Sequence, residues 1–172
     1  KMALATTHIA LKEVPEAIDS ELLIETIEII EKDMQVFFGL KKPTIGVLGL
    51  NPHAGEEGLL GKEELLIIEP TIQYLRKKNK NIIGPISADT AFLQNLDLDI
   101  ILALYHDQGL PLFKFVNPHQ AANVTLGLPI IRTSVDHGIA LDLTASNNVN
   151  NESLHYALMT AKKMYQIYAE KN

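Results

Sequence analysis

Apolar residues recur with helical spacing in three segments of the chain. In the first segment the spacings are 4, 3, 4 and 3, and the residues are Leu23, Ile27, Ile30, Met34 and Phe37. This stripe predicts a helix over residues 20–38, with Ser20 as N-cap and Gly39 as the stop. Residues 62–78 have a similar pattern, although Pro70 is expected to kink or split that helix. The last helix is predicted over residues 153–169, where one side carries Leu154, Leu158, Ala161 and Tyr165.

Short, continuously apolar segments lie between these helices. Residues 44–50 and 100–104 are typical of buried parallel strands. Residues 3–7 resemble the end of a third strand, as if the chain started within that strand, so we expect the chain to be a partial one. Strands that alternate with helices predict an α/β fold, with three α/β/α layers around a mostly parallel sheet.

Composition narrows the possible function classes. The 172 residues are 47% hydrophobic and carry a net charge of -6, which fits a packed globular core and argues against a nucleic-acid binder. No apolar run reaches the roughly 18–20 residues that a membrane span requires. The absence of cysteine excludes disulfides and thiolate chemistry, and it fits a cytoplasmic location.

A histidine follows each of three predicted strands: His8, His53 and His106. In open α/β sheets, ligands bind beyond the carboxyl ends of the strands, so these imidazoles are placed where they can meet at one metal ion. Three histidines would leave coordination positions open for a substrate. The alternative is that each histidine is an ordinary hydrogen-bonded loop residue, and no metal-binding spacing such as HExxH decides between the two.

Lys114, Asn123 and Arg132 form a second group of candidates, set among glycine, proline and short apolar segments. Lysine and arginine neutralise phosphates and carboxylates, and a lysine beside a cation can also act as a general base. The alternative is that the two cations are solvated loop charges. Arg132 directly follows an apolar run, at residues 128–131, which is an unusual place for a free surface charge.

A glycine-rich segment, residues 55–61, precedes the second predicted helix. Glycines before a helix can cradle an anion. Here, however, the segment contains Glu56 and Glu57, and Glu63 and Glu64 follow it at the start of the helix. We expect these acids to cap the helix or to lie near a cofactor hydroxyl. Neither GxGxxG nor GxxxxGK[ST] occurs, so a dinucleotide would bind through another architecture.

Four motifs resemble the 4-hydroxythreonine-4-phosphate dehydrogenase family of pyridoxal 5'-phosphate (vitamin B6) biosynthesis. They are GLNPHAGE (49–56), GPISADT (84–90), YHDQGLP (105–111) and NVTLGLPIIRTSVDHG (123–138). They occur in the family's order, and the resemblance extends over essentially the whole chain. The resemblance implies an NAD-dependent oxidoreductase with the isocitrate/isopropylmalate dehydrogenase fold. It oxidises 4-phosphooxy-L-threonine, and loss of CO2 then gives 3-amino-2-oxopropyl phosphate. Family members are homodimers with an active site shared between the subunits.

The resemblance also implies roles for individual residues. The divalent metal ion (Zn, Mg, Co or Mn) would be held by His8, His53 and His106. The substrate would be bound by Lys114, Asn123 and Arg132. Lys114, Asp107 and Asp89 are the catalytic candidates, with Asp107 orienting a neighbouring ligand. No residue is assigned to NAD.

The resemblance further implies two parts. Residues 1–145 would form a metal-binding and dimerisation domain, and residues 146–172 a C-terminal helix that returns to an N-terminal domain. Without that domain, the helix should expose apolar surface. Two other functions stay open: a related dehydrogenase of threonate or erythronate 4-phosphate, and an inactive metal-binding dimerisation module. No nucleic-acid or membrane partner is expected.

Overall fold

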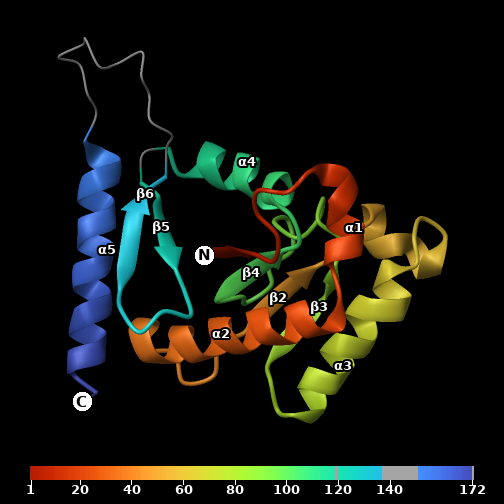
Figure 1. Ribbon diagram of the computed structural model, residues 1–172, viewed down its shortest axis with the longest axis horizontal. Coiled ribbons are helices and arrows are strands. Elements are labelled where there is room, and N and C mark those ends of the chain that lie inside the picture. Colours follow the sequence, from red (N-terminus) through yellow and green to blue (C-terminus); the bar gives the residue numbers. More distant parts are fainter. Residues whose placement is uncertain (119, 137–150, 172) are drawn as a thin grey trace, which may run out of the picture.

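A four-stranded parallel sheet forms the centre of the computed structural model, which describes residues 1–118, 120–136 and 151–171 (Figure 1). The strand order is β1-β4-β2-β3, and the strands are β1 (Met2–Leu4), β2 (Ile45–Leu48), β3 (Ile82–Ile86) and β4 (Ile100–Ala103). In the central pair, Ile45 lies opposite Ile100 and Val47 opposite Leu102. The predicted mostly parallel α/β fold is confirmed.

Helices lie on both faces of this sheet. The main core lies between one face and the helices α2 (Ser20–Phe38) and α3 (Glu69–Lys77), where Ile45, Val47 and Leu102 are fully buried. On the other face lies α4 (His106–Val116). Its Gly109 lies close to the sheet, since an added Cβ would lie 2.2 Å from the sulfur of Met2 and the Met2 side chain would have to move.

Three details of the predicted helices can be compared with the structure. Helix α2 ends at Gly39 as predicted, with φ of 75° at that residue. Its N-cap, however, is Asp19 and not Ser20, because the Asp19 carboxylate accepts a hydrogen bond of 2.8 Å from the Leu22 amide. Pro70 does split the second helix, into a π-helical turn, η3 (Glu64–Ile68), and α3.

Several elements were not predicted from the pattern. They are the short helices η1 (Leu11–Glu13), α1 (Val14–Ala17) and η2 (Pro52–Gly58), together with α4, β3 and a two-stranded hairpin. Helix α4 was missed because Gly109 and Pro111 both have low helical propensity. Its Gly109 lies close to Met2 and Ala103 of the sheet, an arrangement that a pattern of apolar residues does not record.

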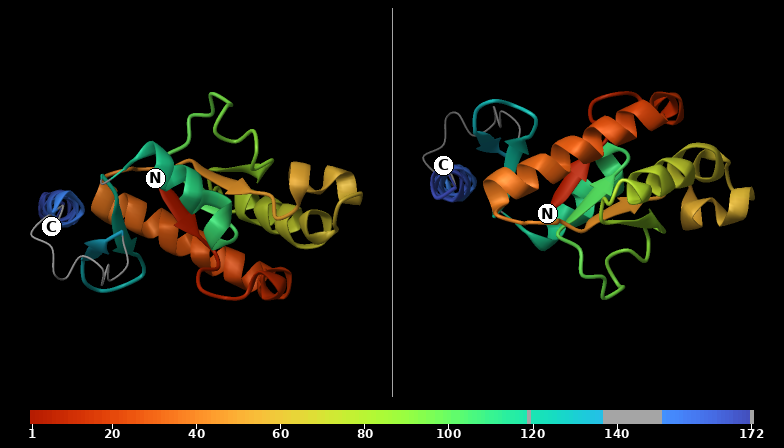
Figure 2. Two further views of the ribbon diagram at one scale, coloured as in Figure 1. Left: turned by 90° about the horizontal axis from the view of Figure 1, so that it is seen from above. Right: turned by 90° about the horizontal axis from the view of Figure 1, so that it is seen from below.

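The hairpin and the last helix form a second region at one end of α2 (Figure 2). Strands β5 (Ala122–Thr125) and β6 (Arg132–Val135) pair antiparallel and pack against α5 (Glu152–Ala169). The buried face of α5 carries Ala157 and Met164, whereas three residues of the predicted apolar stripe are exposed: Leu154 by 53%, Leu158 by 61% and Tyr165 by 63%. The predicted boundary between residues 145 and 146 lies outside the described residues. Within the described part, no helix has the length and apolar character needed to cross a membrane.

Candidate metal and substrate site

His8 and His106 lie side by side at the carboxyl edge of the sheet. Strand β1 continues beyond its regular part, because the Thr6 amide and the Thr6 hydroxyl both donate to the Leu104 carbonyl, at 3.1 and 2.7 Å. This pairing holds the two strand ends together, and the centroids of the His8 and His106 rings are 5.6 Å apart. Two imidazoles from neighbouring strands therefore share one exposed position.

Asp107 contacts Nδ1 of the His106 ring. His106 is the first residue of α4, and its Nδ1 lies 2.6 Å from Oδ1 of Asp107. When a carboxylate accepts the proton on Nδ1, the imidazole is fixed in the tautomer whose Nε2 carries a free lone pair. The His106 side chain is 39% exposed, so that lone pair is accessible to a ligand.

His53 lies on a turn of unusual handedness, in η2. Residues 53–57 all have positive φ, between 43° and 81°, and only Gly55 among them is a glycine. L-residues avoid this left-handed region, at a cost of roughly 1–2 kcal/mol per residue. Such a run persists only when the surrounding structure fixes it.

The buried carboxylate of Glu64 fixes this turn from inside. Glu64 is 1% exposed, and its two oxygens accept from the Asn51 backbone amide at 2.7 Å and from Asn51 Nδ2 at 2.9 Å. The other Asn51 Nδ2 hydrogen is donated to Glu63 at 2.7 Å, and the pKa of Glu63 is lowered first by a backbone hydrogen bond and then by this bond from Asn51. Glu63 is the N-cap residue of η3 by position, but neither Glu63 nor Glu64 makes a side-chain cap hydrogen bond, because both carboxylates accept from Asn51; capping by these two side chains was therefore wrong, and the alternative of a nearby cofactor hydroxyl stays a prediction.

His53 faces Asp89 and not the other two histidines. Its Nδ1 is 3.6 Å from Oδ2 of Asp89. The pKa of Asp89 is lowered, chiefly by a hydrogen bond from the Ser87 hydroxyl and to a smaller extent by His53. Among the described residues of a single copy, no group of three or more histidines and acids could hold a metal ion. The three-histidine site therefore stays a prediction.

The anion-binding candidates lie on α4 and on the hairpin. Lys114 donates to the backbone carbonyl of Asp136 at 3.0 Å and lies 3.5 Å from that residue's carboxylate. Arg132 donates to the Thr125 hydroxyl at 2.7 Å, across the hairpin. Asn123 is exposed and pairs with Ser134.

A cleft of about 1730 Å³ brings most of the candidates together. It is lined by parts of the sheet, α2, α4, the hairpin and α5, and the predicted residues on its wall are His8, Asp89, His106, Lys114 and Asn123. His53, Asp107 and Arg132 are outside this wall. Gln108 and Lys163 also line the cleft and were not predicted from the sequence. Gln108 belongs to the YHDQGLP motif, whereas nothing in the sequence distinguishes Lys163 from the other lysines of its helix.

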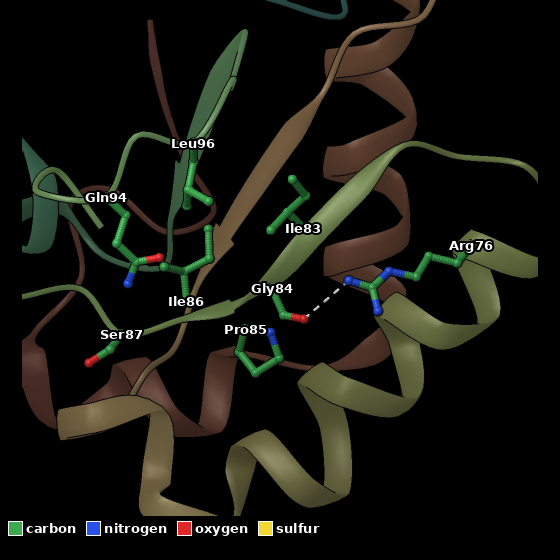
Figure 3. Close-up of a pocket in the computed structure, with 8 residues that line it drawn as sticks. All are labelled: Arg76, Ile83, Gly84, Pro85, Ile86, Ser87, Gln94 and Leu96. Carbon is green, nitrogen blue, oxygen red and sulfur yellow. Dashed lines mark hydrogen bonds between the residues drawn. The ribbon is translucent and has the colours of Figure 1, made fainter. Parts of the chain in front are cut away.

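A smaller pocket of about 350 Å³ lies beside β3 (Figure 3). Its charged lining residue is Arg76, whose Nε donates to the Ile82 carbonyl at 2.9 Å and whose Nη2 lies 3.5 Å from the Gly84 carbonyl. The guanidinium thus ties α3 to β3, and neither an acid nor an imidazole lines the pocket. This pocket is a structural feature of the fold rather than a candidate site.

Comparison with known proteins identifies the family. The family model of the pyridoxal phosphate biosynthetic protein PdxA matches residues 1–161. The chain belongs to the PdxA family. It is 55% identical over 166 residues to a 4-hydroxythreonine-4-phosphate dehydrogenase of Ectopseudomonas mendocina, an alignment that covers 95% of this chain and 49% of the relative. The chain thus spans about half the length of the curated relatives that it matches.

Solved structures agree with the PdxA fold. A crystal structure of 4-hydroxythreonine-4-phosphate dehydrogenase from Klebsiella pneumoniae superposes with a TM-score of 0.84 at 34% identity, covering 95% of this chain and 50% of that one. A terephthalate 1,2-cis-dihydrodiol dehydrogenase from Burkholderia xenovorans superposes with a TM-score of 0.76 at 28% identity, covering 94% of this chain and 52% of that one. The same fold therefore serves dehydrogenases named for different substrates.

Proposed function

We propose that this PdxA-family chain acts in the NAD-dependent oxidation and decarboxylation of 4-phosphooxy-L-threonine to 3-amino-2-oxopropyl phosphate, a step of pyridoxal 5'-phosphate synthesis. The observation that carries the proposal is the match of the family model over residues 1–161, to relatives named for this dehydrogenase activity. The site geometry supports it, because His8 and His106 share a cleft wall with Lys114 and Asn123. We also propose a cytoplasmic location, in line with the cysteine-free composition.

The donor set fits a divalent cation of the Zn, Mg, Co or Mn class. Two exposed imidazoles lie together, and Asp107 stands behind one of them. His53 projects from a different turn and pairs with Asp89, so we propose that the third imidazole comes from the second subunit of a homodimer. When bound, the cation would lower the pKa of a chelated substrate hydroxyl and stabilise the enolate formed by loss of CO2.

The remaining candidates bind and position the substrate. Lys114 and Arg132 would neutralise the phosphate and the carboxylate, and Asn123 would hydrogen-bond to the same molecule. Lys114 is also the candidate for transferring the proton of the substrate hydroxyl. Its amino group lies at the end of α4 that faces Asp136. Asp89, held in the ionised form by Ser87, would attract a cationic group of the substrate.

The test is NADH formation with 4-phosphooxy-L-threonine, accompanied by metal analysis. Lys114→Ala should reduce kcat/KM at least 100-fold, whereas Lys162→Ala, an exposed lysine outside the cleft wall, should leave it unchanged. Preference for threonate or erythronate 4-phosphate would overturn the substrate assignment. Stoichiometric metal without turnover would instead identify a metal-binding dimerisation module.

A further inference from the structure

We propose that Gln108 is a positioning residue: its side-chain amide replaces a missing backbone hydrogen bond between β4 and β2 and so fixes the spacing between His106 and the turn that bears His53. This inference rests on the proposed metal site. It concerns a residue that sets the geometry of the ligands and that does not itself need to touch the metal ion.

The backbone ladder between the two central strands stops short of the site. The last paired residues of β2 and β4 are Val47 and Leu102, and after Leu104 the chain turns into α4. Beyond this point the two strand ends would have no direct link. The side chain of Gln108 supplies it: Oε1 accepts from the Leu104 amide at 2.7 Å, and Nε2 donates to the Gly49 carbonyl at 2.6 Å.

This link completes a row of hydrogen bonds across all four strand ends. On one side of Gln108, the Leu104 carbonyl accepts from Thr6, which follows β1. On the other side, the Gly49 amide donates to the Ile86 carbonyl of β3 at 2.8 Å. The row therefore runs from β1 through β4 and β2 to β3, and Gln108 is its one side-chain amide.

Each candidate ligand lies close in sequence to a member of this row. His8 is two residues after Thr6, and His106 is two residues before Gln108. His53 is four residues after Gly49, on the turn braced by Glu64. A change in the row would therefore move His53 relative to His8 and His106 of the same chain, and in the proposed homodimer it would change where each subunit presents its His53 to the metal site of the other.

Glutamine meets both demands at this position. The Leu104 amide requires an acceptor and the Gly49 carbonyl requires a donor, at the two ends of one planar group. An ionised glutamate offers no donor, methionine offers neither strong donor nor strong acceptor, and asparagine is one methylene shorter.

The experiment compares Co²⁺ binding by the purified wild-type protein, Gln108→Met and the control Gln94→Met. Gln94 is a matched control because the hydrogen bond of its side-chain amide is a local one, to the Thr90 hydroxyl at 3.1 Å. We expect Gln108→Met to weaken Co²⁺ binding about 10- to 100-fold and to change the visible absorption spectrum of the bound ion. Gln94→Met should match the wild type in both measurements.

The outcomes separate positioning from a merely structural role. A lowered melting temperature of Gln108→Met with unchanged Co²⁺ affinity and spectrum would overturn the inference. If that variant does not fold, Gln108→Glu, which keeps the acceptor for Leu104, gives the same readouts. Failure of the wild type to bind Co²⁺ would overturn the proposed metal site, and this inference with it. If the wild type binds Co²⁺ and neither Gln108→Met nor Gln108→Glu changes the affinity or the spectrum, the inference alone is overturned.

Discussion

The carboxyl edge of the sheet and the hairpin region are held in different ways. At the sheet edge, buried or half-buried side chains of Thr6, Gln108 and Glu64 bond directly to the backbone of a neighbouring strand or loop. The hairpin reaches α2 through a buried hydrogen bond, in which Asp33 accepts from the Gly127 amide at 2.6 Å, and through the packing of Leu126 against the main core. We therefore expect the histidine candidates to be held more rigidly than Asn123 and Arg132, which lie on a two-stranded hairpin.

The largest expected effect comes from removing the Glu64 carboxylate, which supports the left-handed turn at residues 53–57. Glu64→Ala leaves the donors of Asn51 without their partner and should lower the free energy of unfolding by about 3 kcal/mol, because hydrogen bonds to a charged group are lost in a buried place. Urea denaturation measures this loss. The matched control is Glu63→Gln, which keeps an acceptor for Asn51 and should change stability by less than about 0.5 kcal/mol. Equal losses in the two variants would contradict the assigned role of Glu64.

A smaller effect is expected when the hairpin is detached from α2. Asp33→Ala removes the buried acceptor of Gly127 and should cost about 2 kcal/mol. Hydrogen exchange should accelerate at Gly127 and along the hairpin while the sheet amides stay protected. Asp33→Asn keeps an acceptor oxygen and serves as the control. Acceleration spread evenly over the sheet and the hairpin would show that the two regions do not differ as described.

A still smaller change in stability is expected on the exposed face of α5. Leu154→Ser combined with Leu158→Ser should alter the free energy of unfolding by less than about 0.5 kcal/mol, since both side chains are more than half exposed. The same change should reduce the fluorescence of a hydrophobic dye. Met164→Ala, on the buried face, should instead unfold at a lower urea concentration. Dye binding that the double variant does not reduce would place the exposed apolar surface elsewhere.

The smallest expected effect concerns the ionisation of Asp89. Its folded pKa lies below the ordinary value, so ionised Asp89 stabilises the fold above the unfolded pKa, and this contribution is lost as the pH falls through the folded pKa. Ser87→Ala removes the main cause and should raise the pKa towards its ordinary value. A carboxyl NMR titration measures the shift. An unchanged pKa would mean that His53 and the backbone, rather than Ser87, hold the charge.

The sequence predicted those elements whose apolar pattern is local. Helices α2 and α5 and strands β2 and β4 follow directly from stripes and short apolar runs. The histidines were expected at one edge of the sheet because each follows a strand, and His8 and His106 do lie together there. The position of His53 could not be predicted, since the turn that carries it depends on Glu64, thirteen residues from Asn51 along the chain. Helix α4 likewise lies against a distant part of the chain, because its Gly109 approaches Met2.

The left-handed turn has a consequence for protein engineering. A loop that is to be grafted onto another scaffold is usually chosen as one continuous stretch, but the left-handed backbone of residues 53–57 is supported by Glu64, which lies outside the loop and accepts from Asn51. An added Cβ at Gly55 would lie 2.7 Å from the same carboxylate, so that side chain and that glycine must be transplanted as a pair. The smallest portable unit is thus discontinuous: the loop, the asparagine before it, and a glutamate from the following helical turn.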